Sequence, residues 1–341
     1  LISDSAQFTR AGAVRVVAGQ DIMVTANAKV SASGAAGSGQ AGGQIALMAH
    51  RDIANEAGSK LYARGDGAGS GGVIEYSALG SMLLNGLRFD AGSQRGVSGQ
   101  IILDPTLATI TGTTLTGGAD ISYVTPDGGD TITVKSGAII NTRKVADGED
   151  ATSAAAVSTG NSGSIKITSP NIVIESGAVL DASVKNAGAS TFTAGDINLI
   201  AKQSSNWGTF VSLSDANASI NVAGTLKARD INMLASIESE AVYGGALGSL
   251  QQGLMAIGSS LLASPLNLSL AYVQATGNAK VVTYAAAVGT SDGGVLLQDQ
   301  LTNSVALATA ALVVNASGPL TDITNTRKIS AVYLRGIAVP R

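Results

Sequence analysis

The sequence predicts an all-β fold, a right-handed parallel β-helix with about 30 residues and three short strands in each coil. Three observations predict it. Apolar residues alternate with polar ones in short bursts, turn-forming residues separate the bursts, and the whole pattern recurs at a fixed spacing. A fixed period of this length indicates a solenoid, in which each repeat buries its apolar face only against its neighbours.

The segment Ser162–Ala201 contains the clearest repeat. Its three bursts are Ile165/Ile167, Ile172/Ile174 and Leu180/Ala182, and GDINL at Gly195–Leu199 then repeats the first burst. Alternation with a period of two is typical of a strand with one buried face. Pro170-Asn171 and Ser176-Gly177 supply turn residues between the bursts, so this segment predicts one coil of three strands.

The pattern Gly-x-apolar-x-apolar extends over most of the chain. Its first apolar residue falls at Val14, Ile45, Ile74, Ile101, Ile121, Ile165, Ile197 and Ile231. The spacings are 31, 29, 27, 20, 44, 32 and 34 residues, which average 31. We therefore expect these residues to lie above one another in a continuous interior column, with successive coils hydrogen-bonded in parallel about 4.8 Å apart.

Glycines mark the corners of the predicted coils, where we expect positive φ angles. The glycine-rich runs Gly34–Gly43 and Gly65–Gly72 fall at the same point of the period. This shared phase favours solvent-facing turns on one edge over flexible linkers. Pro105 cannot donate to a ladder, so strand pairing should be interrupted near it. The polar segment Asn141–Asn161 is predicted to be a long excursion loop.

The texture changes near residue 240, so we divide the chain into a regular shaft, 1–240, and further β-rich coils, 241–341. No charged residue occurs from Ala241 to Ala279. A short helix is predicted at 246–263, because apolar residues there are spaced three or four positions apart and would form one stripe along it. The stripe consists of Leu247, Leu250, Leu254, Ile257 and Leu261. We expect this stripe to be a subunit contact, because interface cores are depleted of charge. Gln251 and Gln252 disfavour the alternative, a membrane span.

Composition excludes several classes of function. The net charge is −3 and no basic stripe occurs, which argues against nucleic acid as a partner. There is no cysteine, so cysteine-based metal and redox sites are excluded, and a single histidine, His50, disfavours histidine chemistry. The opening LISDSAQFTR has no signal-peptide pattern, and we expect the chain to be a piece of a longer protein.

The chain resembles the filamentous-haemagglutinin type of bacterial secreted exoprotein. The matching residues are Gly99, Ile101, Leu103, Asp104 and Pro105, followed by Ser176–Ala182 and Gly195–Ala201. The resemblance lies in the repeated sequence pattern, and it extends over about Ala11–Ala235. It implies a large, secreted or cell-surface protein with a β-helical shaft, often adhesive. Such proteins carry a secretion domain at the N-terminus, which we do not expect within this chain, and the sequence predicts no export route.

The acidic residues of the sequence do not predict a catalytic site. Asp21 and Asp52 share a phase of the repeat, as Asp196 and Asp230 nearly do, but both pairs are expected to be corner carboxylates that bind backbone N–H groups. No cofactor is predicted. The acidic residues of PDGGD and DGED are candidates for calcium, against the alternative of solvated loops: Asp127, Asp130, Asp147, Glu149 and Asp150.

We therefore expect a non-enzymatic structural shaft of a bacterial adhesin or extracellular fibre, located outside the cell. Its ends carry no polar cap, so self-association end to end or laterally is expected, with a host, neighbouring-cell or glycan surface as a further partner. The alternative is a carbohydrate-active or glycan-binding β-helix protein. For that alternative Trp207 and Phe210 are candidates to stack on a sugar ring, although such a pair also serves to cover the edge of a coil.

Overall fold

A computed structural model of the chain describes residues 6–7, 12–126, 130–207, 219–229, 231–243, 267–270, 272–274, 283–289, 313–316 and 328–340. These residues form strands, turns and loops and contain no helix. Neighbouring strands in the described sheets run parallel, as the fixed repeat spacing predicted. Among the described residues, no helix is long and apolar enough to cross a membrane.

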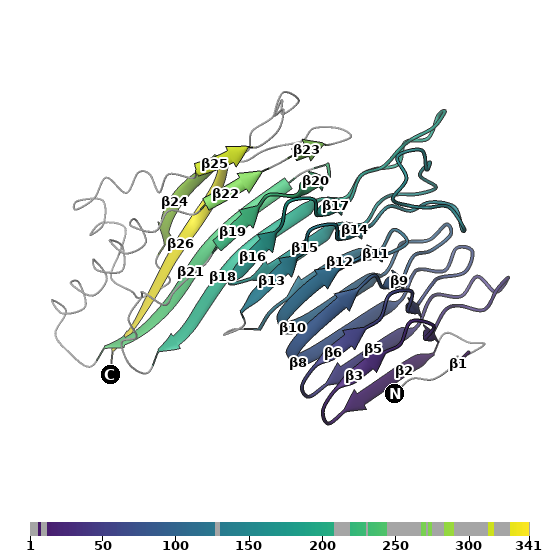
Figure 1. Ribbon diagram of the computed structural model, residues 1–341, viewed down its shortest axis with the longest axis horizontal. Helices are drawn as coiled ribbons and strands as arrows, with labels where there is room; N and C mark the ends of the chain where they lie inside the picture. The colour runs from purple at the N-terminus through teal and green to yellow at the C-terminus, as the bar shows by residue number, and fades with distance from the viewer. Residues whose placement is uncertain are drawn as a thin grey trace.

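Two large sheets contain most of the strands (Figure 1). The nine-stranded sheet has the order β1-β4-β7-β9-β11-β14-β17-β20-β23. Its strands are β1 (Ala6–Gln7), β4 (Lys29–Ser31), β7 (Lys60–Tyr62), β9 (Arg88–Asp90), β11 (Thr113–Leu115), β14 (Ile139–Asn141), β17 (Val179–Asp181), β20 (Thr225–Lys227) and β23 (Tyr272–Gln274).

The fifteen-stranded sheet takes up the first and second bursts of each repeat. The first-burst strands are β2 (Ala13–Ala18), β5 (Gln44–Ala49), β8 (Val73–Asn85), β10 (Gln100–Thr111), β12 (Asp120–Val124), β15 (Ile165–Ser169), β18 (Ile197–Trp207) and β21 (Ile231–Tyr243). The others are β3 (Ile22–Val24), β6 (Ile53–Asn55), β13 (Thr131–Val134), β16 (Asn171–Ile174), β19 (Ser219–Val222), β24 (Thr283–Gly289) and β26 (Lys328–Pro340). In β8 and β10 both bursts form one continuous strand, and β22 (Asn267–Leu270) pairs separately with β25 (Val313–Ala316).

The first-burst residues form the column that their spacing predicted. Val14 pairs with Ile45, and the register continues through Ile74, Ile101, Ile121, Ile165, Ile197 and Ile231. The seven isoleucines are 0–1% exposed, and Val14 at the end of the column is half-buried. The uneven spacings of 20 and 44 residues therefore reflect loops of different length around an unchanged strand register.

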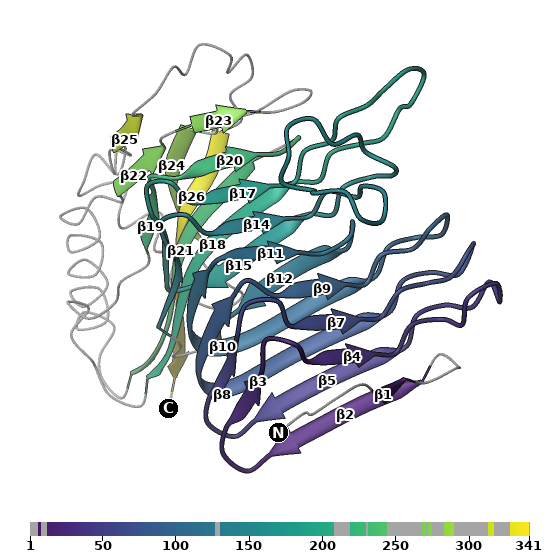
Figure 2. The same cartoon turned by 45° about the vertical axis from the view of Figure 1, so that its right-hand side comes forward.

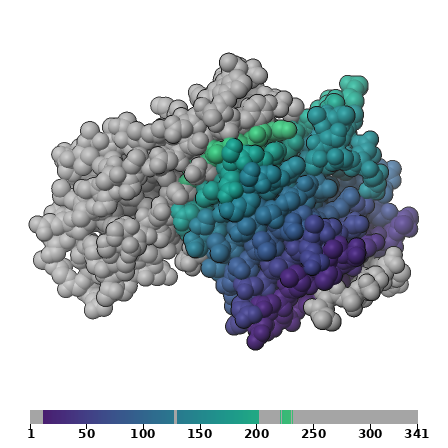
Figure 3. Space-filling view, viewed as in Figure 1, coloured from purple at the N-terminus to yellow at the C-terminus, as the bar shows by residue number. Residues whose placement is uncertain are grey.

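The second and third bursts form two further columns. In the second, Ile22, Ile53, Met82, Ala108, Ile132, Ile172 and Ile220 pair in sequence. In the third, Val30 pairs with Leu61 and then Phe89, and Thr114 with Ile140, Leu180 and Leu226, with a shift of register between β9 and β11. All three columns face one continuous apolar core. The colour gradient of Figure 3 follows these repeats along the described part of the molecule.

Glycine has two different roles at the corners. Gly58, Gly86, Gly137 and Gly177, which precede third-burst strands, have positive φ as expected. The glycines that begin the pattern Gly-x-apolar-x-apolar differ from the expectation, because their φ angles are not positive. Glycine is required at these positions because two backbones approach each other too closely to leave room for a Cβ. A Cβ on Gly43 would overlap the carbonyl oxygen of Gly12, and one on Gly72 would overlap that of Gly43. Only glycine allows this spacing.

Interruptions of the pattern lie where the sequence predicted them. Pro105 pairs with Ala78, and the register shifts directly after it. On the other side of β10, pairing with β12 ends at Leu103 and pairing with β13 begins at Ala108. The residues between β14 and β15 form a long loop, as predicted for Asn141–Asn161. The two glycine-rich runs form the β4–β5 and β7–β8 loops, on the same side of the sheets (Figure 2).

Several predictions concern residues that are not described. The helix at 246–263 and its stripe, Leu247, Leu250, Leu254, Ile257 and Leu261, lie outside the described residues, as do Asp127 and Phe210. The division near residue 240 falls within β21, and beyond that strand only β22–β26 are described. These expectations stay predictions.

Candidate functional site

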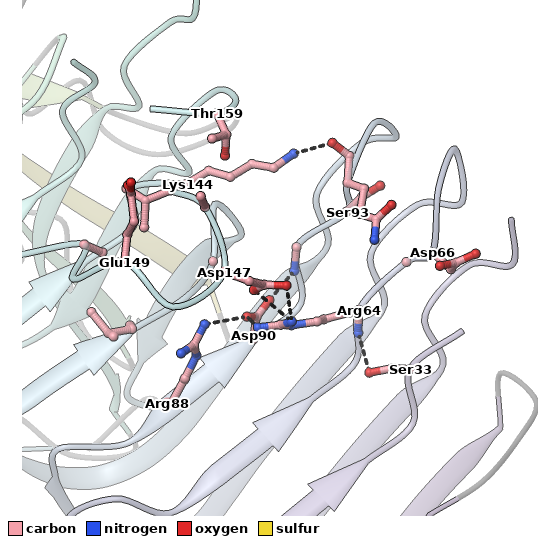
Figure 4. Close-up of a pocket in the computed structure, with 18 of the residues that line it drawn as sticks. Ser33, Arg64, Asp66, Arg88, Asp90, Ser93, Lys144, Asp147, Glu149 and Thr159 are labelled. Carbon is pink, nitrogen blue, oxygen red and sulfur yellow. Dashed lines mark hydrogen bonds and ion pairs between the residues drawn. The ribbon is translucent and has the colours of Figure 1, made fainter. Parts of the chain in front are cut away.

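A cavity of about 370 Å³ opens where the third-burst strands end and their loops begin. Loops after β4, β7, β9, β11 and β14 supply its walls, so residues far apart in the sequence meet there (Figure 4). The parallel register causes this meeting, because the carboxyl ends of strands stacked in one sheet lie at the same edge. Four cationic side chains, Arg64, Arg88, Arg143 and Lys144, and four acidic ones, Asp66, Asp90, Asp147 and Glu149, line the cavity.

Asp90 is the buried centre of this charge cluster, with 5% of its side chain exposed. Its carboxylate lies 2.5 Å from the Arg64 guanidinium and 3.4 Å from that of Arg88. The backbone N–H of Gly92 also donates to it at 3.2 Å. A buried carboxylate needs such partners, because an isolated charge in a protein interior is costly. Asp90 therefore fixes both guanidinium groups at the wall of the cavity.

The contact of Asp90 with the N–H two residues later recurs in this sheet. The side-chain oxygen of Asn141 accepts from Arg143 N–H at 2.9 Å, and that of Asp181 accepts from Ser183 N–H at 2.9 Å. Asp and Asn favour this local turn, in which the side chain replaces a backbone acceptor. The third strand of a repeat thus ends at a buried Asp or Asn in each of these three places.

Arg64 connects the interior to the surface of the site. It binds the buried Asp90 on one side and, at 3.1 Å, the carboxylate of Asp147, whose side chain is 78% exposed. Burial acts to lower the pKa of Arg64, but the two carboxylates outweigh it and the pKa is raised. Asp147 belongs to the β14–β15 loop and is 83 residues from Arg64 in the sequence.

Arg143 gives the β14–β15 loop its shape. Its buried guanidinium donates to the carbonyl oxygens of Ala151 and Ser153 at 2.9 Å and to that of Ala156 at 2.6 Å. Three backbone acceptors bind the two terminal nitrogens of this guanidinium, although its Nε has no hydrogen-bond partner among the described residues, and the residue is only 5% exposed. The loop that carries Asp147 is consequently held by hydrogen bonds from inside.

Lys144 enters the cavity through a slot that glycine keeps open. A Cβ on Gly118 or Gly160 would collide with the Lys144 side chain. The ammonium donates to the carbonyl oxygen of Gln94 at 3.1 Å. Burial lowers the pKa of Lys144, and the negative charge of Asp90 partly opposes that shift. Figure 4 shows the extended side chain crossing toward the loop that contains Ser93.

Tyr62 lies beside the cluster and binds its cations through the ring face. Arg64 is 4.9 Å, Lys29 5.6 Å and Arg88 5.9 Å from the centre of the ring. Contacts of this length are attractive because the ring face carries partial negative charge. Burial raises the pKa of the Tyr62 hydroxyl, against the effect of Arg88 and Arg64. The phenol therefore stays neutral and serves as a platform for the guanidinium groups.

The predicted calcium residues do not meet in one place among those described. Asp147 is paired with Arg64, Asp150 accepts from the N–H and hydroxyl of Thr152, and Asp130 accepts from the hydroxyl of Thr131. Glu149 lines the cavity. In the described part of the chain, no group of three or more His, Cys, Asp or Glu residues could hold a metal ion.

Three of the predicted corner carboxylates, Asp21, Asp52 and Asp196, are described, and each binds a partner in a neighbouring repeat. Asp21 forms an ion pair with Arg51 and accepts from Asp52 N–H at 3.2 Å, and Asp52 accepts from Ser81 N–H at 2.7 Å. Asp196 precedes β18 and pairs with Arg229 at 2.8 Å, whereas Asp230 lies outside the described residues. Each contact links two neighbouring repeats, but the two pairs lie at opposite ends of the first-burst strands. Trp207 is the last residue of β18, and only its backbone is described.

Sequence reasoning did not identify Arg64, Asp90 or Lys144 as site residues. One signal was available: a buried apolar residue followed by Asp or Asn ends the third burst at Phe89-Asp90, Ile140-Asn141 and Leu180-Asp181. The contact between Arg64 and Asp147 had no such signal, since it depends on the path of a long loop. No family model, curated protein or solved structure matches this chain.

Proposed function

We propose that this chain is the structural shaft of a secreted or cell-surface bacterial adhesin or extracellular fibre, wound as a right-handed parallel β-helix. One observation carries the proposal: the register that connects Val14 to Ile231 without a break. A sheet in which each repeat adds one strand lengthens the molecule by about 4.8 Å per repeat. Such a molecule extends and displays what is attached to it.

Thin aliphatic layers support a mechanical role. The interior is made chiefly of Ile, Leu, Val and Ala, and each layer contacts the one before and the one after. Stability in this arrangement is the sum of many neighbour contacts, so length can increase without a larger core. The resemblance to filamentous-haemagglutinin-type exoproteins suggests the same role and an extracellular location.

The first repeat supports end-to-end association. Among the described residues, β2 pairs with β5 on one side. Val14, Val16 and Ala18 are half-buried, whereas the residues that pair with them in β5, Ile45, Leu47 and Ala49, are 0–5% exposed. An open parallel edge above a partly covered apolar layer is a template for another strand. We propose that a further repeat of the same kind covers it.

Electron microscopy of the purified chain tests the shaft. We expect rods of uniform width, and fibre diffraction of aligned material should show a reflection near about 4.8 Å along the rod. Cells that display the chain should adhere to surfaces better than cells that display an unrelated domain of equal length. Compact round particles, or rods without any gain in adhesion, would contradict the structural or the adhesive part of the proposal respectively.

A second candidate function is glycan binding on the side of the shaft. The cavity at the loop side favours it, because charged and hydroxyl-bearing side chains from the loops after β4, β7, β9 and β14 converge there. Binding sites of this kind combine a concave surface with a few well-placed polar groups.

A further inference from the structure

The carboxylate of Asp147 occupies Arg64 at the cavity in the way that the carboxylate of an external ligand could. Asp147 reaches Arg64 from an exposed loop, and its own side chain is 78% exposed. Ion pairs this exposed contribute little to stability, so exchanging the Asp147 carboxylate for another costs little. Arg64 itself cannot leave, because the buried Asp90 holds its other side. A fixed guanidinium with an exchangeable acidic partner is suited to bind an external carboxylate.

Lys144 supplies a second cationic group for such a ligand. Gly118 and Gly160 leave room for its side chain, which is half-buried and directed at the Gln94 loop. In the described part of the chain its ammonium has one acceptor, the Gln94 carbonyl, and an ammonium has three N–H donors. Two donors therefore remain for a ligand. Both Lys144 and Arg64 line the same cavity.

The balance of charge selects the type of anion. The lining contains four cations and four acids, and Asp90 is already bound by two of the arginines. Replacing Asp147 with a single carboxylate leaves this balance unchanged. A phosphate would add further negative charge beside Asp90. The exposed side chains of Gln94 and Thr159 at the wall can bind hydroxyl groups, which a sugar acid carries next to its carboxylate.

We propose that this cavity binds the carboxylate of an acidic saccharide, with Arg64 and Lys144 as the anion-binding groups and Asp147 as the internal carboxylate that the ligand displaces. The inference rests on the second candidate function, glycan binding, and gives it a chemical class and named residues. It does not depend on the shaft. Rods that bind no acidic saccharide would overturn it and leave the shaft intact, and binding without rods would do the reverse.

Titration calorimetry of the full chain with a galacturonic acid trimer tests the proposal. Lys144→Met should weaken binding by about tenfold or more, because a charge-assisted donor is lost. Asp147→Asn should tighten binding about two- to fivefold, because the ligand no longer competes with an internal acid for Arg64. Lys166→Met is the matched control: Lys166 is exposed on β15 outside the cavity, and its replacement should leave the dissociation constant unchanged.

Two comparison ligands define the specificity. Maltotriose, which lacks a carboxylate, and tripolyphosphate, which carries more charge, should both bind more weakly than the galacturonic acid trimer. Equal binding of either comparison ligand, full affinity in Lys144→Met, or weaker affinity in Asp147→Asn would overturn the proposal. Should Lys144→Met fail to fold, the exposed position of Asp147 makes Asp147→Asn the deciding variant.

Discussion

The strand columns and the loop-side cavity are built from opposite kinds of contact. In the columns, an apolar residue meets the equivalent residue of the next repeat, and the side chains are almost fully buried. At the cavity, charged residues meet unlike partners, and Arg64 binds a residue 83 positions away. The columns are therefore encoded by periodicity, whereas the cavity depends on departures from it. The comparison teaches that the repeated apolar columns build the length of the molecule, whereas the charged residues of the loops give one side of it a polar cavity.

Truncating a column residue should have the largest effect. Ile165→Ala removes most of a side chain that is 0% exposed, and a change of this kind costs about 2–5 kcal/mol of unfolding free energy. The neighbouring Lys166 points outward, so Lys166→Ala should cost no more than about 0.5 kcal/mol. Urea unfolding of both variants measures the contrast. Equal losses would mean that Ile165 does not lie in the interior column.

Removing the buried acid of the cavity should have the next largest effect. Asp90→Ala leaves two guanidinium groups without their shared partner, and because both are partly exposed we expect a loss of about 2 kcal/mol. Asp147→Ala removes only the exposed partner of Arg64 and should cost at most about 0.5 kcal/mol. Denaturant unfolding compares the two. A larger loss for Asp147→Ala would refute the central role of Asp90.

The buried hydroxyl of Tyr76 should destabilise the interior of the molecule. Tyr76 is 0% exposed, and its hydroxyl has no hydrogen-bond partner among the described residues. Its ring packs edge-on against Phe89 with the ring centres 5.7 Å apart, which Phe at position 76 would preserve. Tyr76→Phe should therefore raise the unfolding free energy by about 1 kcal/mol. Tyr62→Phe, beside the cations, should give no such gain. A loss of stability in Tyr76→Phe would show that the hydroxyl is bound in solution.

Acidification should weaken the loops and corners more than the columns. Hydrogen bonds lower the pKa of Asp21 through Arg51, of Asp66 through Gly39 N–H and of Glu175 through Lys135. An acid with a lowered pKa in the folded state stabilises the fold above its ordinary pKa, here 3.8 for Asp and 4.5 for Glu. That contribution is lost as the pH falls through the lower, folded value.

We accordingly expect the melting temperature to fall by a few degrees between pH 6 and pH 3 in thermal scans at constant ionic strength. Asp66→Asn should reduce the size of this drop, because the amide does not titrate. A melting temperature that rises on acidification would contradict the assigned hydrogen bonds.

Much of the fold is predictable because each strand of a parallel sheet needs an apolar residue at the same position as the strand before it. The spacing of Val14, Ile45 and Ile165 predicts the strand register, and Pro105 predicts the interruption of that register. The role of Gly43 and Gly72 does not follow from turn propensity, because contact between stacked backbones demands glycine there. The cavity could not be predicted, since the path of the β14–β15 loop brings Asp147 to Arg64 and is set by hydrogen bonds from the buried Arg143.

Cysteine cross-linking tests the register most directly, and the chain has no cysteine of its own. Ser122 pairs with Lys166 across β12 and β15, and both side chains point outward. In-register Cα atoms of neighbouring strands are about 4.8 Å apart, within the range a disulfide spans. Ser122→Cys with Lys166→Cys should therefore oxidise readily to an intramolecular disulfide. Ser122→Cys with Thr168→Cys, displaced by two residues, should not. Cross-linking of the displaced pair in preference to the aligned pair would contradict the register from which the whole fold follows.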